Sequence, residues 1–254
     1  MIESAILSLP EKMNFTIIFT FVAFIAGAIA SVAGFGIGSL LTPLLAVHTG
    51  TKIAVAAVSI PHIAGTALRL WLTRQHVDRH VLWSFGITSA LGGLAGALIH
   101  VGSSSHLLTY ALAALLLFAG FMGVTGLSNR LRFGRRGAWI AGAVSGVLGG
   151  MVGNQGGIRS AAMLGFDVRK EAFVATATAI ALLVDFARMP VYAVADSGAV
   201  FQIWRLVALG TAGVLIGTIF GAQVLHKIPE KLFRRIVSAV VLALGISLLL
   251  FPQH

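Results

Sequence analysis

The sequence predicts an all-α polytopic membrane protein made of two inverted-topology repeats. Of its 254 residues, 57% are hydrophobic and only 10% are charged, whereas about 25% are charged in an ordinary soluble domain. Long apolar stretches follow one another along the chain, and its second half repeats its first with the loop charges exchanged. This composition, with no Cys, excludes a soluble enzyme, a disordered chain and a disulfide-stapled domain.

Each repeat is expected to form a broken helical hairpin followed by three transmembrane helices. The apolar stretches are 15–34, 36–48, 53–72, 81–101 and 106–127 in the first repeat (residues 1–127), and 137–166, 171–195, 202–225 and 232–251 in the second (residues 137–254). As a helix, 36–48 rises only about 20 Å, too little to cross a bilayer alone. It is therefore expected to be the second arm of a hairpin with 15–34, and glycines interrupt 137–166 in the same way.

The internal repeat rests on an ungapped alignment of residues 26–69 with 145–188. Its most informative matches are glycines at one spacing and a pair of arginines, because alanine and valine identities are common in membrane segments. These matches are Gly27 with Gly146, Gly34 with Gly153, Gly38 with Gly157, and Arg69 with Arg188. A second alignment, at a slightly different offset, pairs Gly92 with Gly213 and Gly96 with Gly217.

Charge predicts how the two repeats are oriented. The chain has 18 Lys and Arg against 8 Asp and Glu, but these bases cluster between apolar stretches, so the positive-inside rule explains them better than a nucleic-acid partner. Basic residues concentrate in loops 73–80 and 226–235 and in the linker 128–136, whereas loops 101–106 and 193–201 have no Lys or Arg. Equivalent loops thus differ in charge and are predicted to lie on opposite faces, the basic ones in the cytoplasm and both termini outside.

Two glycine-rich turns are candidate substrate-binding loops. The candidate residues are Gly34, Gly36 and Gly38 in the first turn, and Gly153, Asn154, Gln155, Gly156 and Gly157 in the second. Each turn opens a short helix, whose unpaired N–H groups and positive dipole end favour an anion. The alternative is that the glycines only allow close helix packing. Because the hairpins enter from opposite sides, the turns are predicted to meet near the membrane midplane.

Ionisable side chains inside apolar stretches are costly and are functional candidates by default. Arg159, in the first turn of the helix after the second glycine turn, is the first candidate to bind an anion. Its counterpart is Leu40, so the repeat does not require a charge there. Arg188 is a second candidate, although Asp185 lies three residues before it and the two could form a structural pair. Arg69 is a candidate for gating, the alternative being a side chain that snorkels to the interface.

Several polar residues are further candidates. Ser59 and Thr178 could hydrogen-bond an oxyanion, or bond their own helix backbone. His62 could titrate near neutral pH and Asp185 could carry a coupling proton, so both are assigned to coupling or gating. No His, Cys, Asp and Glu have metal-ligand spacing, and no metal or cofactor is expected. Ser39 lies near a glycine turn, but no motif ties a histidine to it, so the chain is not expected to be an enzyme.

The sequence resembles the TauE/SafE family of membrane transporters, the sulfite exporter family, over nearly its whole length. The clearest match is Gly142–Tyr192, with the glycine-rich stretch 145–150, the second glycine turn and the segment 171–176. The first half matches through Gly27, Gly34, Gly38, Pro43 and Ala54. At both turns the sequence departs from the family's consecutive glycines, through Phe35 and Ile37 in one and Asn154-Gln155 in the other.

The resemblance implies a transporter of the bacterial inner membrane whose partners are the lipid bilayer and a small anion. The expected substrate is sulfur-containing or organic, such as sulfite or a sulfonate, and the expected direction is export. Transport would proceed by alternating access around a midplane site that the two glycine turns make. The alternatives are a carrier for a different small solute, and a membrane enzyme or scaffold that transports nothing.

Overall fold

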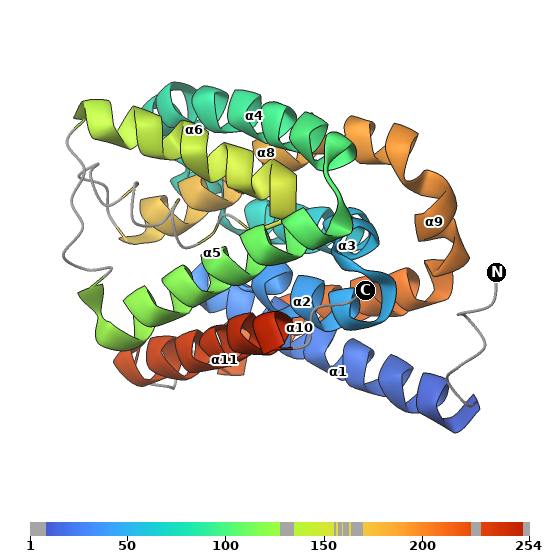
Figure 1. The fold of residues 1–254 in the computed structure, drawn as a ribbon. Coiled ribbons are helices and arrows are strands. Elements are labelled where there is room, and N and C mark those ends of the chain that lie inside the picture. The colour runs from blue at the N-terminus through green and yellow to red at the C-terminus, as the bar shows by residue number, and fades with distance from the viewer. Residues whose placement is uncertain are drawn as a thin grey trace.

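The computed structural model describes residues 9–127, 135–154, 156, 159, 163, 170–224 and 230–250, and these residues form helices joined by short connections, with no strand among them (Figure 1). The helices are α1 (Leu9–Ala33), α2 (Ile37–Thr49), α3 (Thr51–Thr73), η2 (Arg74–His76), α4 (Arg79–Gly102), α5 (Ser105–Thr125), α6 (Arg135–Val152), α8 (Lys170–Ala195), α9 (Ser197–Gln202), α10 (Trp204–Val224) and α11 (Glu230–Leu250). Most of the predicted linker 128–136 and both chain ends lie outside the described residues.

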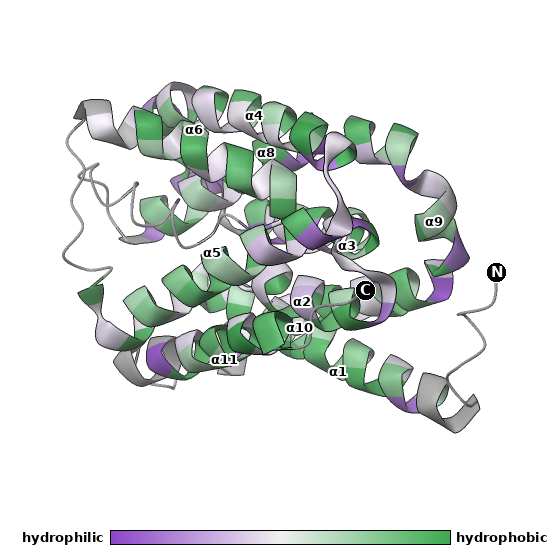
Figure 2. Ribbon diagram, viewed as in Figure 1, coloured by the Kyte–Doolittle hydropathy of each residue, from purple (hydrophilic) through white to green (hydrophobic). Residues whose placement is uncertain are grey.

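Among the described residues, six helices are long and apolar enough to cross a membrane. They are Met13–Ala33, Thr51–His76, Arg79–Gly102, Ser105–Thr125, Glu171–Ala195 and Trp204–Gly221. Shorter apolar helices are Ile37–Thr49, Trp139–Val152 and Arg235–Leu250. Large apolar side chains on the outside of the bundle, such as Trp71 and Phe201, are more than half exposed, and apolar residues run along the helices (Figure 2). A surface this apolar fits a lipid environment, so the predicted class of membrane protein is confirmed.

Both predicted hairpins break at their glycines. Gly34 and Gly36 separate α1 from α2 with φ angles of 78° and 137°, which only glycine adopts without strain. The second break follows α6 at Gly153, whose φ is 72°, and Gly156, Arg159 and Met163 beyond it are helical. The 13-residue α2 is as short as predicted.

The packing pairs the first arm of each hairpin with a helix of the other repeat. α1 packs along α10, and its counterpart α6 packs along α4 (Figure 1). Glycines allow both close approaches: a Cβ on Gly27 would overlap the carbonyl group of Val214, and a Cβ on Gly146 would overlap that of Ser89. This exchange of partners is what two repeats related by a two-fold axis produce. Their opposite orientation in the membrane stays a prediction.

The same contacts correct the second alignment of the repeats. A Cβ on Gly217 would overlap the carbonyl oxygen of Phe24, and one on Gly92 would overlap that of Ala143, which is equivalent to Phe24. The structural counterpart of Gly92 is therefore Gly217, and the pairing with Gly213 was wrong by four residues, about one helical turn. The cause is α9, a helix in the predicted loop 193–201 that is longer than η2, its counterpart in the first repeat.

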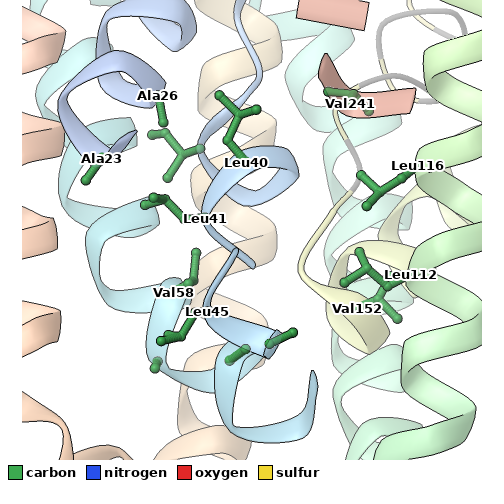
Figure 3. Packing of buried hydrophobic residues seen from close by; sticks show 14 of the residues in the cluster. Ala23, Ala26, Leu40, Leu41, Leu45, Val58, Leu112, Leu116, Val152 and Val241 are labelled. Atoms are coloured by element: carbon green, nitrogen blue, oxygen red, sulfur yellow. The ribbon is translucent and has the colours of Figure 1, made fainter. Parts of the chain in front are cut away.

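The core lies around the short helix α2. Leu41 and Leu45 of α2 are fully buried against α1 and α3, in one cluster that also contains Leu112 of α5 and Val152 at the end of α6 (Figure 3). Because α2 is apolar and enclosed, its first turn is held in the interior. The first glycine turn is therefore placed inside the protein.

Candidate functional site

The two glycine turns lie in contact with each other. A Cβ on Gly38 would overlap the carbonyl oxygen of Gly153, and one on Gly156 would overlap the side chain of Phe35. Gly38, Gly153 and Gly156 are all buried. The turns therefore meet inside the protein, as predicted, while their depth in a membrane stays a prediction.

A small cavity lies between the turns. It is lined by Phe35, Gly36, Gly38, Ser39, His62, Gly153, Asn154, Gly156 and Arg159. Its volume is about 10 Å³, which is room for about one water molecule. The site is thus closed around very little space, and a larger ligand requires the surrounding helices to move.

Donors without partners surround this cavity. Arg159 is 2% exposed, and neither its Nε nor its Nη1 hydrogen-bonds a described residue. The Ser39 hydroxyl donates to Oδ1 of Asn154 at 3.1 Å, and the Nδ2 of Asn154 is likewise buried without a described partner. Buried polar groups are normally paired, since leaving one unpaired costs about 1–3 kcal/mol. These orphaned groups are all donors, so the cavity offers hydrogen bonds to an acceptor.

Arg188, by contrast, is fully paired. Its Nη2 and Nε lie 2.7 Å and 3.0 Å from Oδ1 of Asp185, and its Nη1 donates to the carbonyl oxygen of Gly149 at 2.7 Å. The other oxygen of Asp185 lies 2.7 Å from Nδ1 of His62. Neither Arg188 nor Asp185 lines the cavity. Arg188 thus forms the buried ion pair that the sequence left open, and His62 connects that pair to the cavity.

Arg69 is buried at 3% exposure, so the snorkelling alternative is wrong. Its Nε donates to the hydroxyl of Thr178 at 2.9 Å and its Nη1 to the carbonyl oxygen of Ala30 at 2.6 Å. Ala30 and Gly149 are equivalent in the two repeats, and each lies in the last turn of a hairpin arm. The paired arginines therefore have the same structural role, because each adds a second hydrogen bond to a carbonyl oxygen that already accepts the backbone N–H of Gly34 or Gly153 at the glycine turn.

The remaining predicted site residues lie elsewhere or cannot be placed. Ser59 donates to Ala56 O at 2.5 Å and Thr178 to Val174 O at 2.7 Å, so both bond their own helices, and neither lines the small cavity, nor does Gly34. Gln155 and Gly157 lie outside the described residues. The cavity also includes Phe35 and Ser39, which were not predicted as binding residues. The only signal for them was their place in or beside the first glycine turn.

Fold and cavity together define a polytopic helical membrane protein with a buried, positively charged site. No group of three His, Cys, Asp or Glu in the part of the chain that the structure describes could hold a metal. The family model described as Sulfite exporter TauE/SafE matches residues 19–248, and the chain belongs to this family of membrane transporters. No curated protein and no solved structure matches the chain.

Proposed function

We propose that the protein carries a small oxyanion, such as sulfite or a sulfonate, across the bacterial inner membrane through the cavity between the glycine turns. The single observation that carries this proposal is the buried guanidinium of Arg159, whose Nε and Nη1 have no described partner. A guanidinium holds an oxyanion through two parallel hydrogen bonds. The Nδ2 of Asn154 supplies a further donor, and the start of α2 at Ile37 adds the positive end of a 13-residue helix.

The charges buried around the cavity favour an anion over a neutral or cationic solute. Arg69, Arg159 and Arg188 are buried together with one carboxylate, that of Asp185. With a neutral His62 this cluster has two positive charges in excess. A buried cation is costly unless it is paired. An anion in the cavity would supply the missing pair for Arg159, whereas a cation would add to the repulsion.

A difference between the repeats favours one side of the bundle as the side from which the anion enters. A wide cavity of about 630 Å³ opens between α3, α8, α9 and α10, with Ser59 and Thr211 among its lining residues. In the other repeat, Gly86 of α4 is equivalent to Thr211, but there Leu183 and Ile180 of α8 pack against it. One side is therefore loosely packed where its counterpart is filled. If the filled side became loosely packed while the loosely packed side became filled, the site would open to the other face of the membrane. This exchange is the simplest form of alternating access for inverted repeats.

The experiment is a binding and transport test with sulfite, sulfate and methanesulfonate. We expect purified Arg159→Gln to bind the preferred anion about ten- to a hundred-fold more weakly than the wild type, because a charge-assisted hydrogen bond contributes about 1.5–3 kcal/mol. The matched control is Arg205→Gln, whose exposed side chain lies over the Trp204 ring at the start of α10. An Arg159→Gln protein that binds the anion as tightly as the wild type would refute the proposed binding site. Uptake of labelled anion by proteoliposomes separates a carrier from a protein that only binds.

A further inference from the structure

His62 is held in one tautomer by Asp185. Its Nδ1 lies 2.7 Å from Oδ2 of Asp185, while Arg188 donates two hydrogen bonds to the other carboxylate oxygen. An ionised carboxylate can only accept hydrogen bonds, so the Nδ1 of His62 must carry the hydrogen. A neutral His62 then has a bare Nε2, which is an acceptor.

The same ring lines the cavity between the glycine turns. His62 is the histidine among the lining residues, its side chain is 14% exposed, and its ring edge lies beside Gly38. No hydrogen bond of its Nε2 is seen with the described residues. A fully deprotonated oxyanion, such as sulfate or a sulfonate, also offers only acceptors. Contact between an oxyanion oxygen and Nε2 therefore requires a proton between them.

We propose that His62 takes up one proton at Nε2 together with the anion, so that anion movement is coupled to a proton. This inference rests on the proposed function. The proton comes from water on the side where the anion enters, converts the ring to an imidazolium, and returns to water when the anion leaves. Anion and proton thus move in the same direction. An acid exterior drives uptake of the anion, and a large internal pool drives its export.

The surrounding charges make protonation depend on the anion. His62 faces Asp185 and Arg188 from α8, Arg69 from its own helix and Arg159 across the cavity, while α2 presents the uncharged Gly38 and Ser39. Burial opposes a positive charge on His62 while the cavity is empty, and the guanidinium groups of Arg188 and Arg69 add to this opposition, whereas Asp185 favours the charge. A bound anion offsets this repulsion and accepts the new hydrogen bond. By linkage, protonation of His62 must strengthen anion binding to the same extent.

Asp185 has a different role from the one that the sequence suggested. Both its oxygens are occupied, one by Arg188 and one by His62, and its side chain is fully buried. Taking up the coupling proton itself would break one of these bonds. Asp185 is therefore a positioning residue: it fixes the tautomer of His62 and directs Nε2 towards the ligand.

The test measures proton uptake when the anion binds. Purified wild type, His62→Gln and the matched control His80→Gln, an exposed histidine at the start of α4, are titrated in weakly buffered solution with sulfite, sulfate or methanesulfonate. Sulfate and methanesulfonate do not titrate between about pH 5 and pH 8, so proton uptake with these two anions reports on the protein alone, and sulfite serves to test binding. We expect wild type and His80→Gln to take up about one proton more per bound anion than His62→Gln.

Each outcome decides between the proposals. Equal proton uptake in His62→Gln and wild type overturns the coupling but leaves the anion site intact. If none of the three anions binds the wild type, the proposed function fails and the coupling fails with it. If His62→Gln does not fold or bind, the wild type alone gives the answer. Its affinity for the anion, corrected for the anion's own ionisation, must rise as the pH falls, by up to about tenfold per pH unit for one linked proton, and a constant affinity between about pH 5.5 and pH 8 overturns the coupling.

Discussion

Replacing Gly38 by Ala tests whether the contact between the two glycine turns builds the site. The added methyl group would overlap the backbone carbonyl oxygen of Gly153, and the ring of His62 lies 4.0 Å away. No flexible side-chain end can yield, because Gly153 is met through its backbone. Gly38 is a helical residue with an ordinary φ angle, so alanine is not conformationally strained there, and its higher helix propensity would favour the variant by about 1 kcal/mol. Any loss must therefore come from the overlap.

Overpacking of this kind typically costs about 1–3 kcal/mol. Relief requires the turns to separate, which displaces Asn154 from the first turn and changes the hydrogen-bond geometry around the cavity. We expect the purified Gly38→Ala protein to show a lower unfolding temperature and at least about tenfold weaker anion binding. The control is Gly102→Ala at the end of α4, where an added methyl group meets nothing within 4 Å and both quantities should stay unchanged. A Gly38→Ala protein that binds the anion as tightly as the wild type would refute the assembly of the site from both turns.

Two further predictions follow from the ion pair and from the loop charges. Arg188→Leu should destabilise the protein by about 3–5 kcal/mol, because it leaves the carboxylate of Asp185 buried beside His62 alone, and the double variant Arg188→Leu/Asp185→Leu should recover much of the loss in thermal unfolding. In this chain without native Cys, a membrane-impermeant thiol reagent should label Gln75→Cys only from the cytoplasm and Ser197→Cys, an exposed position in the equivalent loop of the second repeat, only from the outside. Labelling of both from one side would contradict the inverted topology.

Much of the helical architecture could be predicted because it depends on local properties of the sequence. The length and hydrophobicity of 53–72 and 81–101 predict α3 and α4 within two residues at each end. The breaks at Gly34 and Gly153 could be predicted because both positions have positive φ angles that favour glycine. The meeting of the turns followed from the repeat, since related hairpins that enter from opposite sides converge on the axis between them.

What could not be predicted depends on contacts between distant helices. The position of Arg69 near a predicted helix end suggested a snorkelling side chain, but α1 and α8 enclose it and supply its partners. Likewise, no sequence pattern decides whether Asp185 pairs with Arg188, with His62 or with a proton, and the structure brings both residues to it. The pairing of Gly92 with Gly213 failed because an error of four residues, about one helical turn, leaves the hydrophobic pattern in register.

The repeat also separates the scaffold from the chemistry of the site. Where the two halves agree, they build the frame: Arg69 and Arg188 donate to equivalent carbonyl groups, and Gly27 and Gly146 admit equivalent helices. The positions at which the two halves differ include the polar side chains that line the cavity. In the alignment of the repeats, Arg159 corresponds to Leu40, His62 to Ala181 and Asn154 to Phe35. Two repeats related by a two-fold axis can adopt two equivalent packings of similar energy, which alternating access requires. If the polar side chains were repeated in the same way, their cations would be crowded into one small cavity. An asymmetric site in a symmetric frame is therefore what the proposed pairing of one anion with the guanidinium of Arg159 requires.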